Sequence, residues 1–148
     1  MNENRIERSV DLKSAPSKVW KALTDHKQFD QWFSIRLNGP FAVGTTVAGN
    51  LTFEGMEHVS VEFTVTALEP ESRFAYKWHP GAIDPSIDYS KEPETLVEFT
   101  LMPQGSGTKL TVVETGFEKI PGGRRLEAFR MNTEGWVGQL EALVNYVG

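Results

Sequence analysis

Glu114 is the residue whose place in the sequence most strongly suggests chemistry. In the stretch KLTVVETGF it shares the alternation of Leu110 and Val112, so a strand here would point its carboxylate into an apolar interior. A carboxylate in an apolar cavity has a raised pKa, and it could bind a polar group of a ligand or act as a general base. The alternative is a strand-end carboxylate that reaches solvent or pairs with an Arg or Lys. That alternative would hold if Val113 faced the core.

The histidines, serines and glycines of the sequence do not form any known catalytic, metal-binding or phosphate-binding motif. The three histidines, His26, His58 and His79, have no HxH, HxxxH or HExxH spacing, and a metal site needs three or four suitably spaced ligands. The sequence has no cysteine, which excludes disulfides and thiolate chemistry. Neither the GxSxG motif of serine hydrolases nor a phosphate-binding glycine motif occurs. We therefore predict no catalytic residues, no metal and no cofactor.

Several aromatic residues on predicted inward faces are candidates to line a ligand cavity. Pockets for small ligands are mostly apolar and carry few polar groups. Most aromatic residues in a small domain simply fill the core, so each candidate also has a packing explanation. With Glu114, the candidate ligand-binding residues are Trp32, Phe63, Trp78, Phe129 and Trp136.

Trp136 lies between two glycines of a predicted helix, in the stretch GWVG. Each glycine costs a helix about 0.5–1 kcal/mol relative to alanine, so their presence calls for a reason. We interpret Gly135 and Gly138 as sites where helix and sheet backbones approach each other beside the indole and set the volume of the cavity. Replacing Gly138 with leucine would then shrink that volume.

The spacing of apolar residues predicts the elements that would position these side chains. Ser14 is a candidate N-cap of the first helix, with Pro16 in its first turn. The strands should be antiparallel, since they are joined by turn residues. The predicted order is a strand at residues 5–12, short helices near 14–25 and 26–33, about six strands through residue 117, and a long helix from about 124 to 147.

Residues 80–93 form the one long irregular connection, PGAIDPSIDYSKEP. Hairpin loops are usually two to five residues long, and longer loops are often functional lids, although a variable surface excursion is an equal alternative. On the strand after this loop, Glu98 alternates against its apolar neighbours. We expect Glu98 to point outward and to pair with Lys77 or Lys109.

An amphipathic helix and a run of alternating strands predict an α+β fold, in which a curved antiparallel sheet of about six or seven strands wraps the long helix. This is the helix-grip architecture. The chain also resembles the START-like (SRPBCC) superfamily, and within it the proteins similar to the C-terminal domain of the activator of the ninety-kilodalton heat-shock protein's ATPase. The resemblance rests on SAPSKVWKALTDHKQFDQWF, VTALEPESRFAYKW, EFTLMPQGSGTKLTVVETGF and GWVGQLEALVNYV. It implies one START-like domain over residues 1–148.

The function we predict is binding of a small, largely hydrophobic ligand between the sheet and the C-terminal helix. One alternative is a cyclase-like or dehydratase-like enzyme that uses Glu114 with Tyr76 or a histidine as an acid–base pair. Another is a protein-interaction module, as the co-chaperone resemblance implies. In that relative a second domain supplies partner contacts, and these 148 residues leave no room for one, so we do not expect a chaperone partner.

Composition narrows the partners further. The sequence is 39% hydrophobic and 24% charged, as in ordinary globular proteins, and its net charge is −5. A negative surface without a basic stripe argues against nucleic acid. No apolar run approaches the ~20 residues of a membrane span, and the polar first ten residues do not resemble a signal peptide. We expect a cytoplasmic protein, which could form a homodimer through an edge strand.

Overall fold

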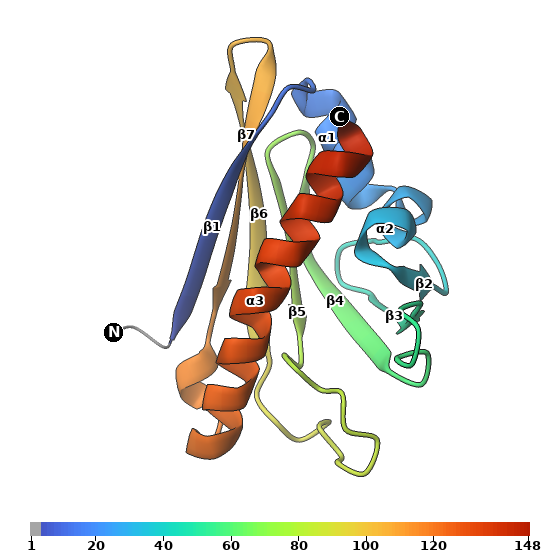
Figure 1. Cartoon of the computed structure of the whole chain (residues 1–148), viewed down its shortest axis with the longest axis vertical. Coiled ribbons are helices and arrows are strands. Elements are labelled where there is room, and N and C mark those ends of the chain that lie inside the picture. The colour runs from blue at the N-terminus through green and yellow to red at the C-terminus, as the bar shows by residue number, and fades with distance from the viewer. Residues whose placement is uncertain (1–3) are drawn as a thin grey trace.

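A curved seven-stranded antiparallel sheet forms the frame of the protein (Figure 1). The computed structural model describes residues 4–148, so the first three residues of the polar N-terminal segment lie outside the described residues. The strands are β1 (Arg5–Leu12), β2 (Ile35–Leu37), β3 (Thr46–Leu51), β4 (Ser60–Glu69), β5 (Arg73–Trp78), β6 (Thr95–Gln104) and β7 (Gly107–Thr115). Their order across the sheet is β1-β7-β6-β5-β4-β3-β2, so β1 and β2 are the edges.

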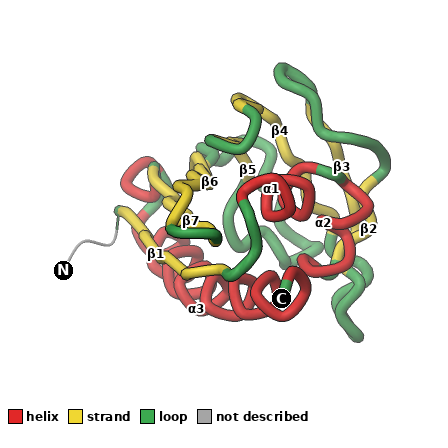
Figure 2. The backbone as a smooth tube through the Cα atoms, turned by 90° about the horizontal axis from the view of Figure 1, so that it is seen from above, coloured by secondary structure: helices red, strands yellow, loops and turns green. Residues whose placement is uncertain are grey.

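The helices cover one face of this sheet. They are α1 (Pro16–Thr24), α2 (His26–Phe33) and α3 (Gly122–Val147), with a short 3-10 helix, η1 (Phe117–Lys119), before α3. Seen from above, the strands curve around α3 from β1 to β2 (Figure 2). The two short helices, α1 and α2, lie beside the C-terminal part of α3 (Figure 1). This is the helix-grip fold that the sequence predicts. The three-residue strand β2 was not predicted. No helix within residues 4–148 is long and apolar enough to cross a membrane.

Alternation along the strands explains why the inner face of the sheet is apolar. Tyr76 lies opposite Val97 in the register of β5 and β6, and Val97 lies opposite Glu114 in the register of β6 and β7. All three side chains are fully buried, so they form one row across the inner face. From α3, the buried residues Trp136, Leu140, Leu143 and Val147 pack onto this face at helical spacing.

Ser14 does not cap α1 as the sequence predicts. The N-cap of α1 is Ala15, without a side-chain hydrogen bond, and Pro16 takes the first helical position. The Ser14 hydroxyl instead donates to the backbone oxygens of Val147 and Gly148, at 3.0 and 3.3 Å. Ser14 therefore joins the start of α1 to the C-terminal end of α3, a role that local sequence does not reveal.

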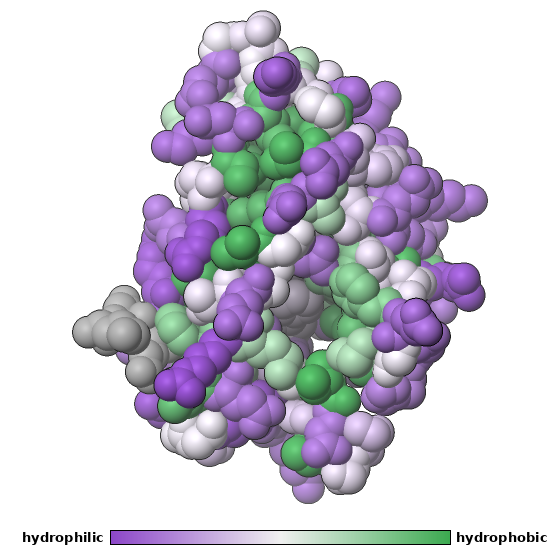
Figure 3. Space-filling model, viewed as in Figure 1, coloured by the Kyte–Doolittle hydropathy of each residue, from purple (hydrophilic) through white to green (hydrophobic). Residues whose placement is uncertain are grey.

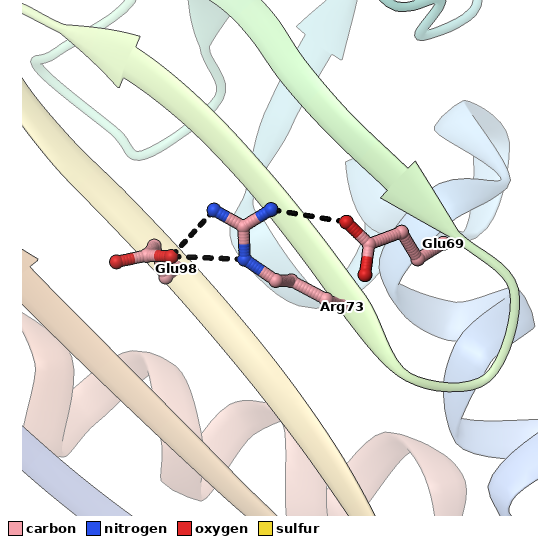
Figure 4. Close-up of polar contacts among 3 residues, drawn as sticks. All are labelled: Glu69, Arg73 and Glu98. Atoms are coloured by element: carbon pink, nitrogen blue, oxygen red, sulfur yellow. Dashed lines mark hydrogen bonds and ion pairs between the residues drawn. The ribbon is translucent and has the colours of Figure 1, made fainter.

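Glu98 lies away from the apolar core, but its predicted pairing with Lys77 or Lys109 is wrong. Its carboxylate accepts from Nε and Nη2 of Arg73, at 2.9 and 2.6 Å. Figure 4 shows the Arg73 guanidinium between the carboxylates of Glu98 and Glu69. The planar guanidinium gives one oxygen of Glu98 two hydrogen bonds, which a lysine ammonium cannot reproduce in the same geometry. The pair stabilises the outer face of the sheet, where β5 and β6 are neighbours.

Candidate functional site

A fully buried carboxylate, that of Glu114, lies where β7 meets α3. Its Oε1 accepts from the indole N–H of Trp136 and from Nδ2 of Asn132, both at 2.9 Å. Its Oε2 accepts from Trp78 at 2.8 Å, Thr95 at 2.5 Å and Asn132 at 3.0 Å. Side chains alternate along β7 so that Glu114 points inward, which is one of the two interpretations of the sequence. Neutral N–H and O–H donors satisfy it, and these hydrogen bonds involve no Arg or Lys among the described residues.

Two opposing effects set the pKa of Glu114. Burial raises the pKa above the ordinary glutamate value, because the charged form loses its hydration. The hydrogen bonds from Thr95, Trp78, Trp136 and Asn132 favour the charged form and lower the pKa. Burial is the larger effect, so the net shift is upward. The five hydrogen bonds reduce the cost of burying this acid, and they also fix the orientation of every side chain that donates one.

Beside this carboxylate lies a cavity of about 450 Å³. Its wall comes from the end of α2, the end of β3 and the following turn, the start of β4, the end of β5 with the loop after it, and the middle of α3. Four α3 residues on the wall share one helical face: Asn132, Gly135, Trp136 and Gln139. Phe53 and Ile87 also line the cavity and are each 46% exposed, which places them at its mouth. Figure 3 shows apolar side chains beside α3 on this side of the molecule.

The loop of residues 79–94 forms one side of the cavity and is held against α3 by Arg124. The Arg124 guanidinium lies 3.2 Å from the Glu92 carboxylate, donates to the backbone oxygen of Pro80 and stacks 4.8 Å from the Tyr89 ring centroid. Both ends of the loop therefore meet one cation near the start of α3. His79 Nε2 lies 3.1 Å from the backbone oxygen of Glu92 and adds a contact across the base.

The structure brings together only part of the predicted ligand-binding set. Trp78 and Trp136 line the cavity, and Glu114 lies directly behind them, hydrogen-bonded to both. Trp32, Phe63 and Phe129 do not contribute to the cavity wall.

Each of these three has a packing role. The indole of Trp32 donates to the backbone oxygen of Ala22 at 2.7 Å and joins α2 to α1. Phe63 is fully buried among other aromatic rings. Phe129 packs edge-on against Phe117 of η1, at 5.4 Å between centroids. The predicted inward-facing positions are therefore buried, but the sequence pattern does not show which of them border the cavity.

The two glycines beside Trp136 do not allow a close approach of backbones, contrary to the sequence interpretation. A Cβ built on either Gly135 or Gly138 meets no atom within 4 Å. Gly135 lines the cavity, so the open space beside it belongs to the cavity. Gly138 is exposed and lies outside the wall. A side chain added at Gly135 would therefore enter the cavity, whereas one added at Gly138 would not.

Asn132 and Gln139 are wall residues that sequence reasoning missed. Both lie on the helical face of Trp136, at positions −4 and +3, and this spacing could have nominated them. Tyr76, considered as an acid–base partner of Glu114, does not line the cavity. Its hydroxyl is buried without a hydrogen-bond partner in the described part of the chain. Burial, with the nearby charge of Glu114 as a smaller effect, raises its pKa well above the usual value.

The fold and the cavity between sheet and C-terminal helix define a helix-grip protein of the START-like class. A family model described as "Activator of Hsp90 ATPase homolog 1-like protein" matches residues 13–148, and the chain belongs to this family. No curated protein matches the sequence significantly.

Solved structures share the fold at low sequence identity. Protein MLL2253 from Mesorhizobium loti is 24% identical with a TM-score of 0.76, over 97% of this chain and 96% of that one. The Aha1 dimer from Colwellia psychrerythraea is 19% identical with a TM-score of 0.73, over 97% and 95%. DynU16, a putative protein in the dynemicin biosynthetic locus, is 24% identical with a TM-score of 0.75, but the match covers 47% of that chain and 97% of this one. At these identities the likeness concerns the fold alone.

Proposed function

We propose that this protein binds a small, largely apolar molecule in the cavity between α3, the start of β4 and the loop of residues 79–94. The observation that carries the proposal is the cavity itself, whose volume of about 450 Å³ falls within the range of small-molecule sites, roughly 300–1,000 Å³. Its wall combines aromatic and aliphatic side chains with a few polar groups, as such sites do.

The packing around the cavity supports a preformed site. Trp78 and Trp136 are held by their hydrogen bonds to Glu114, and the loop is held by Arg124. A wall fixed in this way loses little conformational entropy when a ligand binds, which favours affinity. Phe53 and Ile87 at the mouth are large apolar side chains that a bound molecule would cover.

The geometry favours binding over acid–base catalysis. A general base must come within hydrogen-bond reach of the proton it removes. The Glu114 side chain is not part of the cavity wall, and both its oxygens already accept two or more hydrogen bonds from protein donors. Tyr76 is also outside the wall. We therefore assign Glu114 to holding the wall in place.

Titration with N-phenyl-1-naphthylamine, a neutral fluorescent probe, tests the proposal. The Gly135→Leu variant should bind it at least about tenfold more weakly than the wild type, because the new side chain enters the cavity. Gly138→Leu is the matched control, since it makes the same change on the same helix outside the wall and should bind as the wild type does. Equal binding by both variants, or no binding by the wild type, would refute the proposal.

A further inference from the structure

The polar groups on the cavity wall face it mainly with hydrogen-bond acceptors. Asn132 shows why. Its Nδ2 lies 2.9 and 3.0 Å from the two oxygens of Glu114. Each of those oxygens also receives an indole N–H, which can only donate. The Asn132 nitrogen must therefore point to the carboxylate, and its amide oxygen is the atom left for a ligand.

Gln139 repeats the arrangement seven residues, or about two helical turns, further along the wall. Its Nε2 donates to the backbone oxygen of Phe33 at 3.0 Å, and a carbonyl oxygen can only accept. Its amide oxygen is again the free end. Within residues 4–148, neither amide oxygen receives a protein hydrogen bond. Two acceptors at fixed positions on one helical face therefore require a ligand that donates.

The two tryptophans on the wall strengthen this bias. Both indole N–H groups are used by Glu114, so neither can donate to a ligand. The two rings stack on each other with centroids 5.7 Å apart, and what they can offer to the cavity is ring surface without a donor. The face of an indole carries negative electrostatic potential and attracts cations. A carboxylate or phosphate in the cavity would meet neither the indole donors nor a favourable ring face.

The two carboxylates on the cavity wall give it negative charge. Glu62 and Asp88 both line the cavity and are exposed, which places them toward solvent. Asp88 accepts from the hydroxyl and the backbone N–H of Ser90, and these bonds lower its pKa and keep it ionised. Among the described residues that form the wall there is no Lys or Arg, and the histidine there, His79, has its Nε2 on the backbone oxygen of Glu92. The Ser60 hydroxyl can donate or accept, and the Tyr89 hydroxyl accepts from the backbone N–H of Asp84, so these two offer at most neutral donors beside the two carboxylates.

We propose that the cavity selects molecules with an apolar body and a protonated amine, and that it rejects anionic amphiphiles of the same shape. This inference rests on the proposed function, because it concerns the same cavity. The amine would donate to the amide oxygen of Asn132 or to that of Gln139, with Glu62 and Asp88 supplying the opposite charge.

Three probes with the same ring and different head groups test the inference: 2-naphthylmethylamine, 2-naphthalenemethanol and 2-naphthoate. Each displaces N-phenyl-1-naphthylamine from the wild-type protein at pH 7. The amine should bind roughly tenfold more tightly than the carboxylate, with the alcohol between them, as expected for exposed ion pairs combined with cation–π contacts. Equal or tighter binding of the carboxylate would overturn the inference while leaving the proposed function intact. Failure of all three probes and of the neutral probe would overturn both.

Variants of two wall residues test whether the acidic side chains cause the preference for the amine probe. The double variant Glu62→Gln/Asp88→Asn should lose a large part of the amine preference, about threefold or more, while its affinity for the alcohol stays the same. Glu134→Gln is the matched control, because Glu134 is an exposed acid on α3 outside the wall. An unchanged amine-to-alcohol ratio in the double variant would contradict the role of these charges.

Discussion

Trp78 and Trp136 stack with their ring centroids 5.7 Å apart, and they donate to different oxygens of the same carboxylate. One indole comes from the end of β5 and the other from the middle of α3. Glu114 on β7 therefore connects the sheet to the helix through two rings that also line the cavity. Changes at this carboxylate should affect both stability and the shape of the site.

Replacing Glu114 with glutamine should destabilise the protein by about 1–3 kcal/mol. A glutamine amide has one acceptor oxygen and one donor nitrogen. The two carboxylate oxygens receive N–H groups from Trp136 and Trp78, respectively, so either orientation of the amide places its nitrogen against an indole donor. Urea denaturation at pH 7 measures the loss. Glu134→Gln, an exposed control on α3, should change stability by less than about 0.5 kcal/mol.

The free energy of unfolding should fall, relative to the Glu114→Gln variant, as pH rises above about 4.5, the ordinary value for this acid. The pKa of Glu114 is raised in the folded protein. Between the unfolded and folded pKa values, the folded state keeps a proton that the unfolded state has released. Rising pH then favours unfolding, by at most about 1.4 kcal/mol per pH unit. Denaturation curves of both proteins across this range measure the difference. A difference that grows in favour of the wild type would show that the hydrogen bonds outweigh burial.

Replacing Tyr76 with phenylalanine should stabilise the protein by roughly 1 kcal/mol. The Tyr76 hydroxyl is buried and has no partner within the described chain, so folding removes it from water without compensation. The ring contacts with Phe63, Phe74 and Trp78 remain in the variant. Thermal unfolding measures the gain. Tyr146→Phe is the matched control, since Tyr146 is 37% exposed and should show no change. A loss of stability in Tyr76→Phe would mean that the hydroxyl has a partner, such as a buried water.

Replacing Arg124 with methionine should release the loop of residues 79–94. Arg124 contacts this loop through the Glu92 carboxylate, the Pro80 backbone oxygen and the Tyr89 ring. Amide hydrogen exchange within the loop should become at least about tenfold faster, while exchange in β6 and β7 stays slow. Arg130→Met is the control, because Arg130 is exposed on the same helix. Unchanged exchange in the loop would show that its internal hydrogen bonds hold it without Arg124.

Local patterns predicted the fold because they report which side of an element is apolar. The alternation along β7 left two directions open for Glu114, and the structure has the one in which Glu114 faces inward with Val112. The helical spacing of Trp136, Leu140 and Leu143 indicated the buried face of α3. Both patterns relate residues that are close together in the chain, so they can be read from a single sequence without an alignment.

The site was predicted only in part because it depends on distances between elements. Trp78 and Trp136 were nominated as aromatic residues, but their hydrogen bonds to Glu114 span 36 and 22 residues. No spacing rule reports such a bond. Thr95 was missed for the same reason, and the open volume beside Gly135 follows from the packing of five separate segments. Phe129 was assigned to the cavity because its position fits the stripe, whereas Phe117 of η1 takes up its ring.

The contacts of Glu114 also set the order in which this chain can become stable as it is synthesised. Three of its five hydrogen bonds come from Asn132 and Trp136, and the remaining two come from Trp78 and Thr95. A nascent chain that has left the ribosome only as far as β7 already carries the acid and the aromatic face of the sheet, but it lacks two of the four donor groups and the long helix α3. Such intermediates are prone to aggregate. The part of the inner cover that α3 provides is therefore added late, when α3 docks.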